Sequence, residues 1–290
     1  MSSSARRTSG VASSQVDDAA PGARAPSPLA PSFDSVTPLR EPAPAVEPAV
    51  RIDHVAKRFG DGPLVLDDIS LDVAPGEFVC LLGASGCGKS TLLNLIAGLD
   101  RPTAGAIRTP AEGSAVMFQE SALMPWLTAR RNVELALRLR GVPRGERREK
   151  ALELLDSVNL ADAAVKRPHE LSGGMRQRVA LARALAQDRP VLLMDEPFAA
   201  LDAITRDLLH EELERVWRAT GRTIVFVTHN VREAARLGQR VVLLGSRPGR
   251  VVEEWRIAKT RGRRIESPEV AALSVEITEQ LRKEIRRNAA

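Results

Sequence analysis

The sequence predicts an α/β fold with a mostly parallel sheet, because strand-like apolar runs alternate with helical periodicity from about residue 50 onward. The runs at 78–82 and 191–194 are continuously apolar, which is typical of strands buried on both faces. No apolar run reaches the ~18 residues that a membrane helix requires, and no signal peptide is recognisable. We therefore expect a chain that is cytosolic or lies on the cytosolic face of a membrane.

The composition of the 290 residues is ordinary for a globular protein, with 43% hydrophobic and 27% charged residues. Its 42 Lys and Arg residues exceed its 37 Asp and Glu residues by five. This mild basic excess is compatible with phosphates, anionic lipid or nucleic acid and does not choose among them. Two cysteines, Cys80 and Cys87, are too few for a disulfide scaffold or a metal cluster.

The first 48 residues differ from the rest of the chain, since they are rich in Ala, Pro and Ser and lack aliphatic periodicity. Such a segment buries too little apolar area to offset the entropy of ordering it, so we predict that residues 1–48 are disordered.

The elements of the folded part follow in order along the chain. Strands are predicted from 52, over 69–73 and 78–82, at 115–118 and 191–194, and over 223–228 and 240–244. Helices are predicted from Thr128 to about residue 140 and over 145–158, 175–187, 203–220 and 231–237. No strand pattern lies between 128 and 166, which indicates a helical subdomain inserted into the α/β core. Ser267 and Pro268 start a last helix, whose apolar stripe is Val270, Leu273, Ile277, Leu281 and Ile285.

A glycine-rich loop lies between the buried strand at 78–82 and the helix that follows it. It fits the pattern G-x-x-x-x-G-K-[S/T] and consists of Gly83, Ala84, Ser85, Gly86, Cys87, Gly88, Lys89, Ser90 and Thr91. Its glycines let consecutive backbone N–H groups point inward at an anion, and the helix start adds the positive end of its dipole. Lys89 can reach the β- and γ-phosphates of a nucleotide, and the Ser90 hydroxyl can ligate Mg²⁺. The Cys87 thiol beside bound phosphates predicts that alkylation blocks activity and that ATP protects.

Two carboxylates, Asp195 and Glu196, follow the strand at 191–194. Many strands end at an acidic turn, but behind a phosphate loop Asp195 can hold Mg²⁺ and Glu196 can accept a proton from an attacking water. Upstream, Ser172 can cap the helix that follows it, and Gly173 and Gly174 leave the first N–H groups of that helix uncovered. This is either a capped helix alone or a second anion site.

These motifs occur in one order: the phosphate loop, Gln119, Leu-Ser-Gly-Gly at 171–174, Asp195-Glu196 and His229 after a strand. Together they resemble the nucleotide-binding subunit of an ATP-binding-cassette (ABC) transporter, from about residue 50 to 256. The resemblance implies a P-loop NTPase core with an antiparallel β element. The nucleotide-binding domain would span 49–258, with the helical subdomain at approximately 120–172, and a basic linker and helix would follow over 259–290.

The resemblance also implies the cofactors ATP and Mg²⁺ and a role for each site residue. Glu196 would be the general base, His229 the switch residue at the γ-phosphate, and Gln119 the sensor of Mg²⁺ and water. Mg²⁺ would be held by Ser90, Gln119 and Asp195. Phe59 is the nearest candidate for stacking on adenine, because the chain has no Tyr; it could equally be a core or strand-end residue. ATP would be closed over by the signature segment of a second copy, and Asp202 would couple the two sites of this head-to-tail homodimer. The signature segment comprises Leu171, Ser172, Gly173, Gly174 and Gln177.

Three further stretches, at 118–128, 195–206 and 246–251, resemble the nitrate, sulfonate and taurine importer group. The resemblance implies an ATPase that is peripheral to the cytoplasmic face of the inner membrane. Its partners would be separate integral-membrane permease subunits and a periplasmic or lipid-anchored substrate-binding protein, with no nucleic acid. The alternative is an ABC ATPase of DNA repair or translation, but the interval from Lys89 to Ser172 carries no sustained heptads of a long coiled coil. Which oxyanion is carried does not follow from this sequence.

Overall fold

The computed structural model describes residues 47–245, 247–257 and 267–287. The extension predicted over 1–48 lies outside the described residues except for its last two residues. Residues 259–266 of the predicted basic linker also lie outside them.

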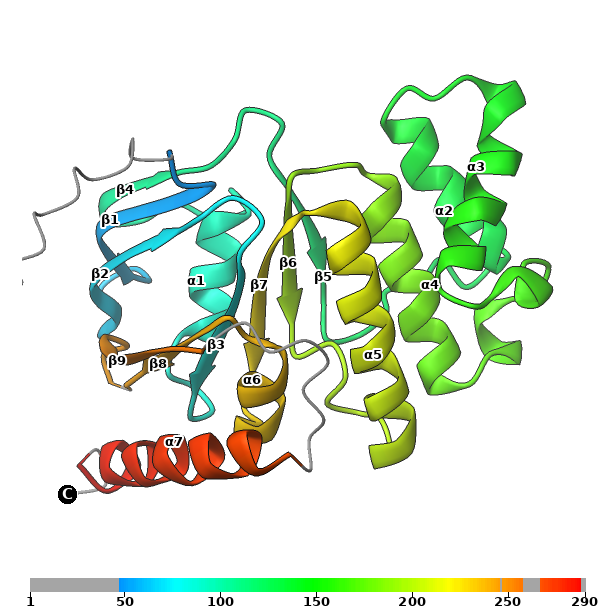
Figure 1. The fold of residues 1–290 in the computed structure, drawn as a ribbon. Coiled ribbons are helices and arrows are strands. Elements are labelled where there is room, and N and C mark those ends of the chain that lie inside the picture. The colour runs from blue at the N-terminus through cyan, green and yellow to red at the C-terminus, as the bar shows by residue number, and fades with distance from the viewer. Residues whose placement is uncertain (1–46, 246, 258–266, 288–290) are drawn as a thin grey trace, which may run out of the picture. The chain divides into compact units, whose positions relative to one another are not determined.

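The central sheet has six strands, ordered β5-β6-β7-β3-β8-β9. The first five are parallel, and β9 closes the edge in antiparallel pairing with β8 (Figure 1). Their bounds are β5 Ser114–Met117, β6 Val191–Asp195, β7 Thr223–Thr228, β3 Phe78–Gly83, β8 Arg240–Leu244 and β9 Val251–Arg256. The predicted parallel sheet is therefore confirmed, and its order places the carboxyl ends of β3, β6 and β7 at one edge, where ligands bind in open α/β sheets.

A second sheet is antiparallel and has the order β2-β1-β4. Its strands are β1 Val50–Arg58, β2 Leu64–Val73 and β4 Ala104–Arg108. It corresponds to the antiparallel β element that the family resemblance implies. Gly105 fits here because a Cβ at this position would lie 2.3 Å from the His54 carbonyl oxygen of the neighbouring strand.

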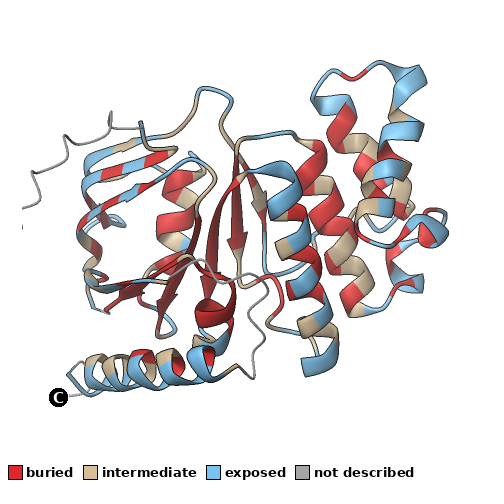
Figure 2. Ribbon diagram, in the orientation of Figure 1, coloured by how far each residue is buried: buried red, intermediate tan, exposed pale blue. Residues whose placement is uncertain are grey.

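The alternation of side chains along β3 divides the core in two. Val79 and Leu81 pack with helix α1 (Lys89–Ile96) and with the antiparallel sheet. Phe78 and Cys80 point to the other face, which is covered by α4 (Gly173–Ala186), α5 (Ala203–Thr220) and α6 (Val231–Leu237). Both faces are buried, which explains the continuously apolar sequence of β3 (Figure 2).

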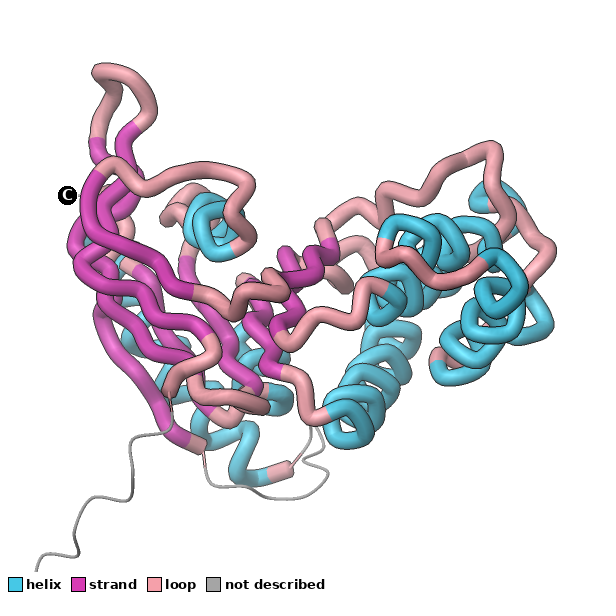
Figure 3. Tube along the Cα trace, turned by 90° about the horizontal axis from the view of Figure 1, so that it is seen from above, coloured by secondary structure: helices cyan, strands magenta, loops and turns pink. Residues whose placement is uncertain are grey.

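The chain between β5 and β6 is helical, as predicted. It contains α2 (Ala129–Leu139), α3 (Arg144–Ser157), two 3₁₀ turns at Ala161–Ala163 and Pro168–Glu170, and then α4. Thr128 caps α2 by accepting a hydrogen bond from the Arg131 N–H at 3.3 Å. Viewed from above, α2 and α3 and the antiparallel strands lie at opposite ends of the central sheet (Figure 3).

The last helix, α7 (Pro268–Arg287), packs on α6 through Val270 and Ile277. The Trp255 indole N–H of β9 donates to Glu276 at 2.8 Å and fixes the helix to the sheet edge. Ile285, the last member of the predicted apolar stripe, lies outside this contact and is exposed. Among the described residues, no helix combines the length and apolar character needed to cross a bilayer.

Candidate active site

The phosphate loop joins β3 to α1 and is shaped by glycines. Gly86 and Gly88 have φ angles of +78° and +96°, a region that side-chain-bearing residues rarely adopt. Gly88 also caps α1, and a Cβ on it would lie 2.6 Å from Leu66 of β2. The loop can therefore lie directly against the antiparallel sheet.

Lys89 is held inside this loop and is only 6% exposed. Its Nζ donates to the carbonyl oxygens of Gly83 and Ala84 at 2.9 and 3.0 Å. These neutral acceptors leave the ammonium charge available, and the Glu196 carboxylate lies 4.0 Å away. The loop thus carries a concentrated positive charge at the start of a helix, which is the arrangement that attracts phosphate.

The end of β6 lies beside the phosphate loop. Burial raises the pKa of Asp195 above its ordinary value, with a smaller contribution from the neighbouring charge of Glu196, although the Ser90 side chain opposes this rise. A partly buried carboxylate with too little positive charge around it is a suitable ligand for a cation.

The backbone conformation of Glu196 orients its side chain. Its φ is +43°, which is strained for a residue with a side chain, and its N–H donates to the Val227 carbonyl of β7 at 3.0 Å. Its Oε2 lies 2.8 Å from Nδ1 of His229, which follows β7. Glu196, His229 and Lys89 therefore converge at the carboxyl edge of the sheet, although they are up to 140 positions apart in the sequence.

The side chain of Cys87 is buried inside the loop. It is 1% exposed, and a Cβ on Gly83 would lie 2.7 Å from its Sγ. Its Sγ also lies 3.9 Å from Lys89 Nζ. Burial raises the pKa of the thiol, although Lys89 partly opposes this. The expectation that alkylation blocks activity and that ATP protects stays a prediction, and the burial of the thiol indicates that alkylation is slow.

Phe59 follows β1 directly and is 54% exposed, with Lys57 Nζ 4.7 Å from its ring centroid. The strand that follows its turn, β2, reaches the phosphate loop through Leu66. Of the positions left open for Phe59, the core position is wrong and the strand-end position agrees with the structure. Stacking of its ring on adenine stays a prediction.

The signature segment begins α4. The Ser172 hydroxyl accepts from the Met175 N–H at 3.2 Å and caps the helix. Gly173 faces Leu201, and a Cβ on Gly174 would lie 2.5 Å from Thr205 Cγ2. Since α4 lies on the face of the sheet opposite to α1, the structure does not bring this segment to the phosphate loop of the same chain.

Two other signature residues are turned inward. Leu171 is buried, and Gln177 is buried with its Nε2 donating to the Gln119 carbonyl oxygen at 2.9 Å. Gln177 therefore fixes the backbone of the loop that carries Gln119, while the side chain of Gln119 itself is exposed beyond β5, next to the end of β6.

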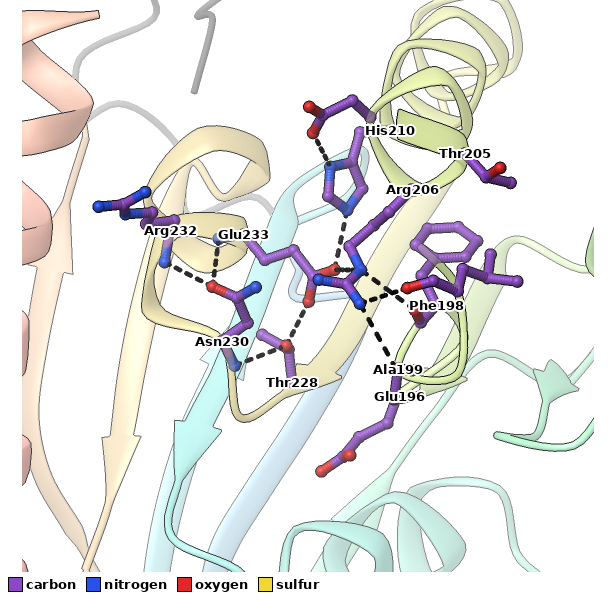
Figure 4. A network of polar contacts seen from close by, with 12 residues as sticks. Glu196, Phe198, Ala199, Thr205, Arg206, His210, Thr228, Asn230, Arg232 and Glu233 are labelled. Atoms are coloured by element: carbon purple, nitrogen blue, oxygen red, sulfur yellow. Dashed lines mark hydrogen bonds and ion pairs between the residues drawn. The ribbon is translucent and has the colours of Figure 1, made fainter. Parts of the chain in front are cut away.

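Asp202 caps α5 by accepting from the Thr205 N–H at 3.0 Å, a hydrogen bond that also lowers the pKa of its carboxyl. Four residues further on, Arg206 donates to the carbonyl oxygens of Phe198, Ala199 and Leu201 at 3.2, 3.5 and 2.7 Å (Figure 4). Arg206 thereby holds the whole loop between Glu196 and Asp202, a function that sequence reasoning missed.

Arg206 belongs to a buried polar network between α5, α6 and the end of β7 (Figure 4). Glu233 lies at its centre, 2.9 Å from His210 Nε2 and 3.9 Å from Arg206 Nε, and it accepts a hydrogen bond from the Thr228 hydroxyl. Arg236 donates to His210 Nδ1 at 3.2 Å, so Nδ1 is an acceptor and Nε2 carries the proton that is donated to Glu233. The one sign of this buried network in the sequence is His210, which lies within the apolar face of its helix.

This phosphate loop at the end of β3, with a carboxylate pair at the end of β6 on the same edge of the sheet, defines a P-loop nucleoside triphosphatase. A family model described as ABC transporter matches residues 66–199. The taurine import ATP-binding protein TauB of Chromobacterium violaceum is 48% identical over 216 residues, covering 72% of this chain and 83% of that protein. The aliphatic sulfonates import ATP-binding protein SsuB 1 of Mesorhizobium japonicum is 46% identical over 258 residues, covering 86% and 96%.

A solved structure agrees with these relatives. The dimeric post-hydrolysis state of the ATP-binding cassette MJ0796, bound to ADP and Pi, superposes with a TM-score of 0.63 at 36% identity, covering 73% of this chain and all of that one. The chain belongs to the ABC transporter family and is an ATPase of that family. Both relatives above carry import in their names, so the alternative in DNA repair or translation gains no support.

Proposed function

We propose that this chain hydrolyses ATP to drive a bacterial importer of small oxyanions of the aliphatic sulfonate, taurine or nitrate type. The observation that carries the proposal is the convergence of Glu196, His229 and Lys89 at the phosphate loop. The names of the relatives support this class of oxyanion. The proteins that contact the oxyanion determine which one is transported.

The residues at the end of β6 fit Mg²⁺. The Ser90 side chain lowers the pKa of the Asp195 carboxyl, and both groups supply oxygen ligands of the kind that Mg²⁺ prefers. Gln119, beyond the adjacent strand β5, would add an amide oxygen. A bound Mg²⁺ supplies positive charge that neutralises the phosphate oxygens of the nucleotide.

The hydrolytic roles follow from the same geometry. The Glu196 carboxylate would accept the proton of the attacking water, because its backbone and His229 hold it beside the loop. Lys89 would exchange the carbonyl oxygens of Gly83 and Ala84 for phosphate oxygens, and the exposed ring of Phe59 would stack on the adenine.

A second copy of the chain would complete the site. The phosphate loop leads into α1 on one face of the sheet, whereas Ser172, Gly173 and Gly174 begin α4 on the other. In a head-to-tail homodimer the uncovered N–H groups of α4 would close over the nucleotide of the partner, and Asp202 would couple the two sites. The dimeric MJ0796 cassette supports this arrangement.

The permease would dock in a groove of about 440 Å³ between α1, β5 and the helical segment. Three large apolar side chains line it and are exposed, namely Leu99, Phe118 and Leu139. The groove lies directly before Gln119, so a permease seated there would reach the hydrolytic site through one loop. We therefore place the subunit at the cytoplasmic face of the inner membrane, in a complex with permease subunits and a periplasmic or lipid-anchored binding protein.

The test is Glu196→Gln, with Glu149→Gln, an exposed acidic residue of α3, as the matched control. We expect Glu196→Gln to bind ATP, to lose hydrolysis by about 10²–10⁴-fold, and to accumulate as a dimer in size-exclusion chromatography with ATP and Mg²⁺. Glu149→Gln should behave as the wild type. Normal hydrolysis by Glu196→Gln would show that the base is assigned wrongly.

Ser172→Arg tests the second copy separately. ATP binding to the isolated subunit should be retained while turnover is abolished. The Arg side chain at the start of α4 would prevent this segment from closing over the nucleotide of the partner. An equal loss of ATP binding would place Ser172 in the site of its own chain and contradict the head-to-tail dimer.

A further inference from the structure

The helical segment carries an arginine-lined concavity that the ATPase site does not use. It measures about 380 Å³ and lies between α2 and α3. One acidic residue, Glu134, and two leucines accompany its six arginines, Arg130, Arg131, Arg138, Arg144, Arg147 and Arg148. The formal charge of this lining is therefore +5. We call these six residues the arginine concavity.

The spacing of the arginines explains why they converge. Arg131 and Arg138 are seven residues apart on α2, and Arg144 and Arg148 are four apart on α3, so each pair shares one helix face. The two helices pack as a hairpin, which turns the faces toward the same hollow. Like charges gathered in this way repel one another unless an anion lies between them.

Internal partners neutralise little of this charge. Arg130 pairs with Glu134, and Arg147 donates to the Val142 carbonyl oxygen at 2.6 Å, which leaves its charge uncompensated. Within the ranges that the structure describes, Arg131, Arg138, Arg144 and Arg148 have no ion pair within 4.0 Å. Glu146, which lies between Arg144 and Arg148 in α3, is paired with Lys150 instead.

The surroundings of the concavity fit an extended anionic surface. These four arginines are exposed, so no buried polar group encloses a small ion. Trp126, 68% exposed, precedes the lining residue Leu127. Exposed aromatic side chains beside cationic ones are typical of proteins that touch the headgroup region of a bilayer.

We propose that the arginine concavity binds the headgroup phosphates of anionic phospholipids and so holds the helical segment against the membrane. The guanidinium fork matches two phosphate oxygens at once. Leu135 lines both this concavity and the groove proposed for the permease, so a subunit seated on a permease would bring the arginines close to the bilayer. The inference rests on the proposed function for the presence of that membrane, but it is tested on the isolated subunit.

The experiment is cosedimentation of the full chain with vesicles of phosphatidylcholine, alone or in equimolar mixture with phosphatidylglycerol. The test variant carries Arg131→Gln, Arg138→Gln, Arg144→Gln and Arg148→Gln. The control variant removes four exposed cations from α7, through Arg282→Gln, Lys283→Gln, Arg286→Gln and Arg287→Gln. ATPase activity and thermal unfolding establish that both variants are folded.

We expect the wild type to bind the mixed vesicles and not pure phosphatidylcholine. Each arginine near an anionic surface contributes about fivefold in affinity, so the test variant should bind at least about tenfold more weakly, and the control variant within about twofold of the wild type. Failure of the wild type to bind, equal losses in both variants, or binding of a DNA oligomer in place of vesicles would overturn the proposal. Vesicle binding needs no hydrolysis, so its failure is distinguishable from failure of the Glu196→Gln test.

Discussion

Replacing Glu233 by Gln tests whether the buried network stabilises the protein. Gln keeps the shape of the side chain but removes the one acidic group within 4.0 Å of Arg206 among the described residues. It also weakens charge-assisted hydrogen bonds from His210 and Thr228. A hydrogen bond to a charged group contributes about 1.5–3 kcal/mol, and breaking a buried ion pair costs about 3–5 kcal/mol. Because Gln still accepts one of the hydrogen bonds, we expect a loss of about 2–3 kcal/mol in the free energy of unfolding.

This loss corresponds to a fall in Tm of roughly 4–12 °C for a folded unit of this size. Differential scanning fluorimetry without nucleotide measures it directly. The matched control is Glu211→Gln on α5, whose side chain is 68% exposed and 3.8 Å from Arg236. A surface pair contributes about 0–1 kcal/mol, so the control should lose less than about 4 °C. A Tm for Glu233→Gln within about 2 °C of the wild type, or an equal fall in the control, would refute the reasoning.

The pH dependence gives an independent check on the same residue. Burial by itself raises the pKa of Glu233, but the hydrogen bonds and charges of His210, Thr228 and Arg206 outweigh it, and the net pKa lies below the ordinary 4.5. Unfolding therefore takes up a proton below that pH, and the stability that Glu233 contributes is present above pH 4.5 and lost as the pH falls further. The difference in Tm between the wild type and Glu233→Gln should be constant from neutral pH to about 5 and should narrow below 4.5.

Two further predictions follow from close contacts. Gly174→Ala should lower Tm by roughly 3–10 °C, because its Cβ would lie 2.5 Å from Thr205 Cγ2. Adding Thr205→Ser, which removes that methyl group, should recover most of the loss, and a double variant no more stable than Gly174→Ala would exclude the clash as the cause. The Cys87 thiol should react with iodoacetamide at least about tenfold more slowly than glutathione at pH 7.5, since it is buried and its pKa is raised. Mass spectrometry after timed quenching measures this rate, and labelling of Cys87 as fast as glutathione would show that the loop opens readily without nucleotide.

The elements that could be predicted are those whose apolar pattern or capping residues lie within the element itself. The continuously apolar β3 and the capped helices α2, α4 and α7 were all predicted within a few residues. By contrast, β4 and β9 were not predicted, because apolar and polar residues alternate too weakly along both strands. In β4 the glycine and alanines are exposed, and β9 is an edge strand with two glutamates. Their pairing depends on neighbouring strands that are distant in the sequence, and local periodicity contains no information about such neighbours.

The candidate site shows the same division. Lys89, Asp195 and Glu196 are predictable because their spacing around strand ends fixes which edge of the sheet they reach. The orientation of Gln177 is not, since a glutamine near a helix start gives no sign that it turns inward to the Gln119 carbonyl oxygen. Glu233 likewise resembles a solvated helix residue, and only the packing of α5 against α6 supplies the partners that make its burial tolerable.

Arg206 connects the two loops that carry the hydrolytic residues. Its guanidinium group fixes three carbonyl oxygens in the loop that follows Glu196, and through Glu233 it reaches Thr228, the residue before His229 (Figure 4). Glu196 and His229 are also hydrogen-bonded to each other at 2.8 Å. A displacement of either loop would therefore have to break contacts of Arg206 or the bond between Glu196 and His229. The position of the candidate base thus depends on a side chain of α5, a helix that lies outside the phosphate loop.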